Sequence, residues 1–143
     1  MKKDLAVELI RAMQLVQRHV RQKLALEKSH GFSMSQIRTL SVLAEQTYSL
    51  SDLADFAGVD ITSMSRMIQV LEKRGLVSRR TGLKDRRRVD FELTAKGMKA
   101  HLKVSEAVRE ELRGQLKILS NSEAKNMEDA LGILRKIFEV SPR

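Results

Sequence analysis

Residues 50–94 read LSDLADFAGVDITSMSRMIQVLEKRGLVSRRTGLKDRRRVDFELT, and this stretch decides the fold. Within it, three apolar residues recur at the spacings of one helical face: Met64, Ile68 and Leu71. Asp60 is placed to cap the start of this helix, and Gly75 to end it, because glycine takes the left-handed conformation without a Cβ clash. The pattern predicts a helix of about four turns whose methionines, Met67 included, belong to a core rather than to a cofactor site.

The opposite face of this helix carries polar side chains that can donate hydrogen bonds, and none of them is acidic. They are Thr62, Ser63, Ser65, Arg66, Gln69 and Lys73. A helix of this length fits the major groove of DNA, where such groups read base edges. Arg66 suits either a guanine edge or a phosphate, whereas Lys73 suits a phosphate because it lies toward the helix C-terminus.

A shorter helix is predicted immediately before this one. Its inner face carries Leu53, Ala54 and Ala57. Ser51 is placed to cap it, Gly58 supplies the turn between the two helices, and Val59 is expected to pack beneath that turn. A short helix, a glycine turn and a polar-faced helix together form a helix-turn-helix candidate.

A β-hairpin is predicted after the polar-faced helix that ends at Gly75. Its first strand spans 77–80, and the second shows the alternation of a half-buried strand in Val89, Phe91 and Leu93. The loop between the strands contains the charged run Lys84, Asp85, Arg86, Arg87 and Arg88. Three consecutive arginines at a hairpin tip have no packing role and repel one another, so we expect their counter-ion to come from outside the chain.

Positive charge is concentrated in this part of the chain. Residues 66–88 hold nine basic and two acidic residues, a net charge of +7, whereas the whole chain carries +9. Basic runs are usually solvated faces. Placement on a helix face and a hairpin tip instead favours a polyanion partner, and the phosphates of a duplex are the simplest one.

These residues resemble the winged helix-turn-helix of the MarR family of bacterial transcription regulators. The matching motifs are Leu53-Ala54, Gly58-Val59, Met64-Ser65-Arg66-Met67-Ile68, Leu71-Glu72-Lys73, Gly75-Leu76-Val77, and Asp85-Arg86-Arg87 followed by Leu93-Thr94 and Gly97. The chain departs from the family at Gly82-Leu83, where a proline is frequent, and at Gln69-Val70, where an acidic and a basic residue are common. These departures bear on base preference rather than on the fold.

The resemblance implies roles for the hairpin loop, or wing. Arg87 would enter the minor groove, oriented by Asp85, while Arg86 and Arg88 would reach phosphates. By residue type alone, Asp85 suits a plain turn position equally well.

Further helices are predicted on both sides of this unit. Ser33 and Gln36 have the spacing of a capping box at the start of a helix that follows Gly31, and Ser120 and Glu123 have the same spacing at the start of the last helix. Thr94 is placed to cap the long helix that follows the wing, and residues 47–49 are expected to be a plain connector.

A first helix is predicted up to Gly31, because Leu5, Leu9, Met13, Val16, Val20 and Leu24 recur every three or four residues. This helix and the two that follow the wing leave apolar stripes that one small winged unit cannot cover. The stripes form either an intrachain bundle core or the interface of a two-fold homodimer, and the resemblance favours the dimer. The predicted fold is mainly α with a small β-hairpin wing. We expect a single domain over 1–143, in which 33–94 form the winged helix-turn-helix DNA-binding region and 1–31 and 95–143 a helical dimerisation region.

Composition and motifs exclude several other classes. The chain has no cysteine, and its histidines, at 19, 30 and 101, lack the spacing of a metal pair, so neither a metal site nor a cofactor is expected. Phosphate-binding loops and protease or hydrolase motifs are missing, which argues against an enzyme. No apolar run suits a signal peptide or a membrane span, so a cytoplasmic protein without a membrane partner is expected.

The sequence therefore predicts a homodimeric transcription regulator that binds a pseudo-palindromic operator in double-stranded DNA and usually represses. By resemblance, a small-molecule effector, for example a phenol, would release it from DNA. The alternative is a sequence-indifferent architectural protein that coats DNA. The uncharged middle of the recognition face, Thr62, Ser63 and Ser65, suits base edges better than phosphates and so favours the regulator.

Overall fold

The computed structural model describes residues 4–26, 31–81 and 85–139. Its elements in chain order are α1 (Leu5–Leu26), α2 (Met34–Glu45), β1 (Tyr48–Ser49), α3 (Leu50–Ala57), α4 (Ile61–Lys73), β2 (Val77–Thr81), β3 (Val89–Leu93), α5 (Ala95–Leu116) and α6 (Asn121–Phe138). The chain divides into two compact units, residues 1–108 and 109–143. The mainly helical fold with a small β wing is confirmed.

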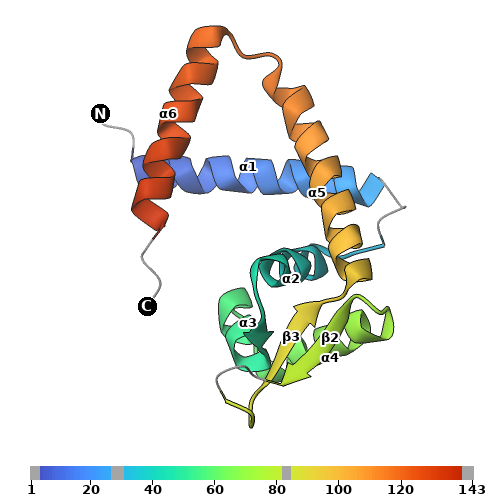
Figure 1. Ribbon diagram of the computed structural model, residues 1–143. Coiled ribbons are helices and arrows are strands. Elements are labelled where there is room, and N and C mark those ends of the chain that lie inside the picture. The colour runs from blue at the N-terminus through green and yellow to red at the C-terminus, as the bar shows by residue number, and fades with distance from the viewer. Residues whose placement is uncertain (1–3, 27–30, 82–84, 140–143) are drawn as a thin grey trace. The chain divides into compact units, whose positions relative to one another are not determined.

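The first unit contains a three-stranded antiparallel sheet in the order β1-β3-β2. The longer pair runs from Val77 opposite Leu93 to Thr81 opposite Val89, and β1 joins the other edge of β3. Helix α2 contacts β3, α3 packs on α4, and α4 contacts β2 (Figure 1). The sheet and these three helices therefore form one winged helix-turn-helix body.

The core of this body lies between the sheet and the three helices. Its buried members are Leu40, Leu43, Leu53, Ala54, Met64, Ile68, Leu71, Leu76, Val77 and Phe91. The predicted inner face of α4 is confirmed, since Met64, Ile68 and Leu71 are fully buried. Burial of apolar surface of this kind is the main term that holds such a small body together.

Several expectations about α3 and the segments beside it are wrong. The helix is capped by Ser49 rather than Ser51, because Ser49 Oγ accepts a hydrogen bond from the Asp52 backbone N–H at 3.1 Å. The supposed connector before it contains β1, which the sequence did not reveal because two residues are too few for a periodic pattern. Ala57 and Val59 are exposed rather than packed inside.

The turn from α4 into the sheet is held by residues of the family motif. Thr94 Oγ1 donates to the Gly75 carbonyl at 2.6 Å and accepts from the Gly97 N–H at 3.0 Å, capping α5 as predicted. Gly97 is buried, and a Cβ at this position would overlap the Leu76 carbonyl oxygen. Glycine is needed here because the first turn of α5 approaches the α4–β2 turn so closely.

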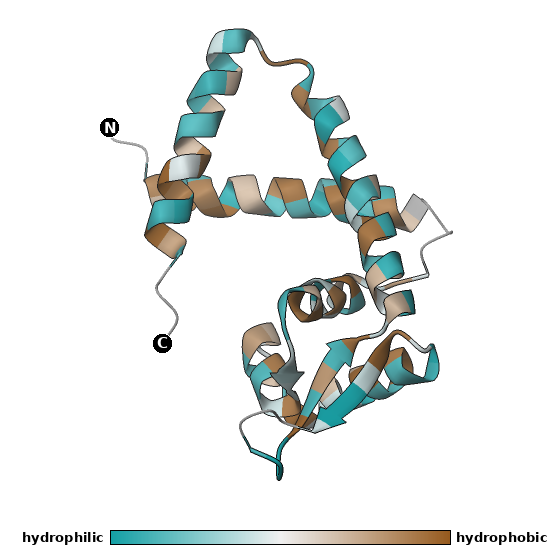
Figure 2. Ribbon diagram, viewed as in Figure 1, coloured by the Kyte–Doolittle hydropathy of each residue, from teal (hydrophilic) through white to brown (hydrophobic). Residues whose placement is uncertain are grey.

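Apolar residues run along α1 and α6 (Figure 2). In the single chain, Ile10, Met13 and Val16 of α1 and Leu131 and Ile137 of α6 are each more than half exposed. The capping box at Ser120 and Glu123 that starts α6 is confirmed, as is the one at Ser33 and Gln36 that starts α2. Helices α1 and α6 are well formed, and each leaves apolar surface uncovered within one chain.

Candidate nucleic-acid interface

Helix α4 begins at the cap that the sequence predicted. Asp60 Oδ1 accepts the Ser63 backbone N–H at 2.8 Å, and Asp60 Oδ2 accepts the Ser63 hydroxyl at 2.8 Å. The hydrogen bonds from the Ser63 backbone and then from its hydroxyl lower the pKa of Asp60 below its usual value of 3.8. The Ser63 hydroxyl is therefore committed to the cap in the free protein, although its oxygen can still accept another hydrogen bond.

The outward face of α4 carries the candidate DNA-reading side chains. Thr62, Ser63, Arg66, Gln69 and Lys73 are exposed, whereas Ser65 is half-buried. Within the described residues, no acidic side chain pairs with Arg66 or Lys73. This surface is cationic and rich in donors, opposite the fully buried apolar face.

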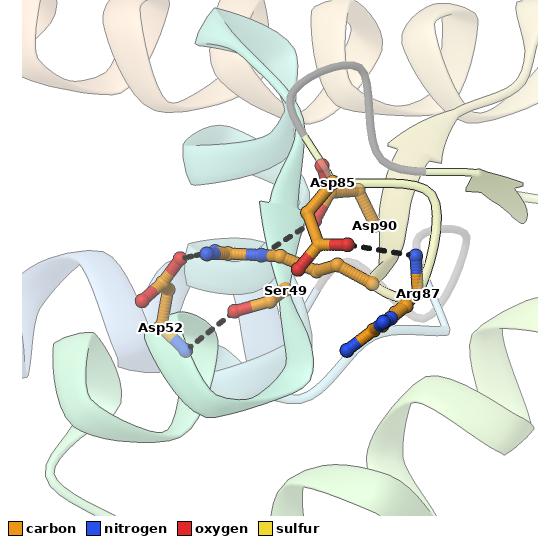
Figure 3. A network of polar contacts seen from close by, with 6 residues as sticks. Ser49, Asp52, Asp85, Arg87 and Asp90 are labelled. Carbon is orange, nitrogen blue, oxygen red and sulfur yellow. Dashed lines mark hydrogen bonds and ion pairs between the residues drawn. The ribbon is translucent and has the colours of Figure 1, made fainter.

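Backbone hydrogen bonds to Asp85 form the turn at the wing tip. Its carboxylate accepts the Arg87 backbone N–H at 2.9 Å (Figure 3). Its carbonyl accepts the Arg88 N–H at 3.0 Å. These contacts match the Asx-type turn that was the alternative for Asp85. Lys84 lies outside the described residues, so its predicted contact remains a prediction.

The expectation that all three wing arginines lack partners within the chain is wrong for Arg88. Its guanidinium donates to Asp90 Oδ1 at 3.2 Å through Nε and to the Asp52 carboxylate through a second nitrogen. Arg86 and Arg87 are exposed, and no ion pair is found for them among the described residues. Arg86 and Arg87 are thus available for a partner outside the chain, whereas Arg88 is already paired.

Other cations of the basic stretch are also paired or anchored within the chain. Arg79 pairs with Glu72 at 3.1 Å, and Arg80 pairs with Glu92 at 3.2 Å. Arg74 donates to the Gly31 carbonyl at 2.9 Å, and its guanidinium carbon lies 4.1 Å from the centre of the Phe32 ring. Within the described part of the basic stretch 66–88, the cations without an acidic partner or such an anchor are therefore on α4 and at the wing tip: Arg66, Lys73, Arg86 and Arg87.

Asp52 and Asp90 are site residues that the sequence reasoning missed. Asp90 could have been found, because it lies two residues from Arg88 and therefore on the same side of an extended strand. Asp52 lies 36 positions away, and nothing local in the sequence connects it with the wing. Only the folding of α3 beside β3 brings the two together.

Within residues 4–26, 31–81 and 85–139, no group of three or more histidine or acidic side chains is arranged to hold a metal ion. Of the helices described, none is long and apolar enough to cross a bilayer. What the described residues do offer is a capped helix and a β wing that present cations on their outer surfaces.

A helix-turn-helix followed by a β wing, with available cations on the second helix and the wing, defines the winged-helix class of DNA-binding proteins. Residues 32–89 match the model of the MarR family. The chain belongs to the MarR family of helix-turn-helix transcriptional regulators, as its motifs predicted.

Comparisons with known proteins agree with this assignment. The chain is 31% identical over 108 residues to the helix-turn-helix transcriptional regulator YfiV of Bacillus subtilis, covering 75% of this chain and 68% of that protein. It is 34% identical over 103 residues to the transcriptional regulator FarR of Neisseria gonorrhoeae, covering 71% and 70%. The crystal structure of NadR in complex with 4-hydroxyphenylacetate superposes with a TM-score of 0.69 at 30% identity, covering 95% of both chains.

Proposed function

We propose that this regulator binds a pseudo-palindromic operator as a homodimer and usually represses transcription. One observation carries the proposal: within the basic stretch 66–88, the described cations without an acidic partner or an anchor lie on the outer face of α4 and at the wing tip. Each subunit would lay α4 in a major groove, with half-sites separated by about one helical turn. An architectural protein that coats DNA without regard to sequence would use the same cations, but it would make no use of the uncharged side chains in the middle of that face.

Within this proposal the candidate side chains have different roles. Thr62, Ser65 and Gln69 would meet base edges, as would Ser63 through its remaining acceptor capacity. Arg66 would contact either a guanine or a phosphate, and Lys73 a phosphate. On the wing, Arg87 would enter the minor groove while Arg86 and Lys84 contact phosphates. Asp85 would hold the turn that presents Arg87.

The exposed apolar surface of the terminal helices supports a dimer. Helices α1 and α6 each carry apolar side chains that are more than half exposed in the single chain. Large apolar surfaces of this kind are usually covered by a partner, and a two-fold arrangement covers the same helices in both copies. Two-fold symmetry in the protein would then require an inverted repeat in the operator.

Small-molecule release is the second part of the proposal. NadR, at 30% identity, binds 4-hydroxyphenylacetate in its crystal structure, so a phenolic or aromatic acid is the effector class to test first. Such a ligand would weaken DNA binding only if it binds more tightly to the dimer whose recognition helices have the wrong spacing.

The test is selection of bound fragments from sheared genomic DNA at near-physiological salt, followed by sequencing. We expect a few enriched fragments that share an inverted repeat, and 4-hydroxyphenylacetate is then titrated against one of them. Even recovery of all fragments, with affinity that collapses as salt rises, would instead support the architectural protein.

A further inference from the structure

Arg88 lies where the wing tip joins strand β3, and it is paired with carboxylates, unlike Arg86 and Arg87. The ladder between β2 and β3 ends at the pair Thr81 and Val89, so Arg88 lies one residue beyond the last paired position. From there its guanidinium reaches Asp90 on β3 and Asp52 on α3, both of which are labelled in Figure 3. We call these two ion pairs the Arg88 bridge.

The Arg88 bridge closes a ring of contacts between the wing and the helix-turn-helix. Ser49 of β1 pairs with Asp90 of β3, and the Ser49 hydroxyl accepts the Asp52 backbone N–H. The Asp52 carboxylate accepts from Arg88, and Arg88 donates in turn to Asp90. Asp52 is set in place as the third residue of a capped helix, whose N-terminal dipole also favours a carboxylate there.

We propose that Arg88 is a positioning residue that ties the wing to α3, and not a phosphate contact. The inference rests on the proposed function, in which Arg87 and Arg86 contact DNA from the tip of the same wing. Arg88 follows them directly in the chain, so the bridge limits where the tip can lie relative to α3 and α4. A wing already held in place loses less conformational freedom when it binds DNA.

The direction in which DNA affinity changes when Asp52 is neutralised separates the two roles of Arg88. Asp52 places a negative charge beside the cationic wing, so neutralising it should strengthen binding to phosphates if Arg88 simply contacts DNA. If Arg88 is a positioning residue, neutralising Asp52 loosens the wing and weakens binding although the protein has become more positive. The two readings therefore predict opposite changes.

The first experiment needs no DNA. Asp52→Asn leaves every tryptic site intact, and we expect cleavage after Arg86 and Arg87 to become about threefold faster, as suits the loss of an exposed ion pair. The matched control is Asp55→Asn, which removes the same charge from the same helix at a side chain without a described partner. The Tm of both variants is measured so that faster cleavage by global unfolding is recognised.

The second experiment measures affinity for the selected operator at several salt concentrations. We expect Asp52→Asn and Arg88→Gln to weaken binding by similar factors, about threefold, and the double variant to be no weaker than either. Arg88→Gln should leave the salt dependence nearly unchanged, whereas Arg86→Gln should lower its slope by roughly one. Arg88→Lys, which can still pair with one carboxylate, should recover part of the affinity.

Two results would overturn the inference: unchanged cleavage of the wing in Asp52→Asn, or tighter operator binding by that variant together with a slope reduced by roughly one in Arg88→Gln. If the wild type selects no operator, the proposed function fails, but the cleavage experiment still decides whether the Arg88 bridge holds the wing.

Discussion

Arg87 and Arg88 are adjacent, carry the same charge and sit in the same loop, yet their surroundings separate them. Arg88 has two carboxylates within reach, whereas the Arg87 backbone is held by Asp85 and its guanidinium has no acidic partner among the described residues. A cation already paired gains less from a phosphate than one that is not, because binding must first break the existing pair. We therefore propose Arg87, which has no acidic partner among the described residues, as the better DNA contact of the two.

Arg87→Ala tests this directly. We expect operator affinity to fall roughly 10- to 100-fold, since a charge-assisted contact in the groove is lost, while Tm and oligomeric state stay unchanged. Fluorescence anisotropy with a labelled operator measures the affinity. Lys117→Ala, which removes an equal charge at an exposed position outside the interface, is the control and should retain binding. Wild-type affinity in Arg87→Ala would remove the wing from the mechanism.

The cap at Asp60 makes a second prediction. Its pKa is lowered by the hydrogen bonds from Ser63, so its charge stabilises the folded state above pH 3.8, and this contribution is lost as pH falls through the folded-state pKa. Asp60→Asn keeps a capping oxygen but cannot ionise. We expect its Tm to lie below that of the wild type at pH 7 and the gap to close below about pH 3.8.

Thermal unfolding followed by circular dichroism at several pH values provides the measurement for Asp60→Asn. Asp55→Asn serves as the control, because Asp55 is exposed on α3 and caps no helix. A gap for Asp60→Asn that stays constant from pH 7 to pH 3 would contradict the assigned cause of its lowered pKa.

The position of α5 depends on a close backbone approach. Gly97 lets the first turn of α5 sit against the Leu76 carbonyl, while Thr94 joins the same turn to Gly75. The start of α5 is therefore in direct contact with the α4–β2 turn. This is a packing reason for the glycine that the family motif contains.

Gly97→Ala should destabilise the protein by about 3 kcal/mol, since a methyl group cannot fit against a backbone oxygen without moving α5. Chemical denaturation gives the free energy of unfolding. Gly114→Ala lies in the same helix with open space around its Cβ, and we expect it to be neutral or stabilising by about 0.5–1 kcal/mol. Equal losses in the two variants would mean that helix propensity, not the close approach, controls the effect.

The apolar faces of α1 and α6 remain uncovered in the single chain. Leu131 and Ile137 lie on the apolar side of α6, and both are more than half exposed in the single chain. Helices this apolar are stable in water chiefly when a partner covers them. The operator geometry proposed above depends on that partner being a second copy.

Leu131→Glu should convert the dimer to a monomer, because a carboxylate buried in an apolar interface has no counter-charge. Light scattering after gel filtration should then give 16.3 kDa instead of twice that mass, and operator affinity should fall with it. The control, Lys136→Glu, places the same charge on the opposite side of α6 and should leave the mass of the dimer unchanged. A wild type that is monomeric at micromolar concentration would contradict the homodimer.

Much of this protein could be predicted from its sequence because the deciding signals are local. Helical spacing identified the buried face of α4, caps identified the starts of α2, α4, α5 and α6, and glycines identified the turns. Each of these depends on residues within about one helical turn of one another. The wing and the MarR family membership followed from the same short motifs.

The features that could not be predicted from the sequence depend on residues far apart in the chain. The two-residue strand β1 exists because β3 offers it a partner, and Ser49 rather than Ser51 caps α3 because the helix starts directly from that strand. The charges of the basic stretch were visible in the sequence, but which of them are neutralised was not. Arg88 meets Asp52 across 36 positions, and such an ion pair leaves no trace in local spacing since only the packing of α3 beside β3 creates it.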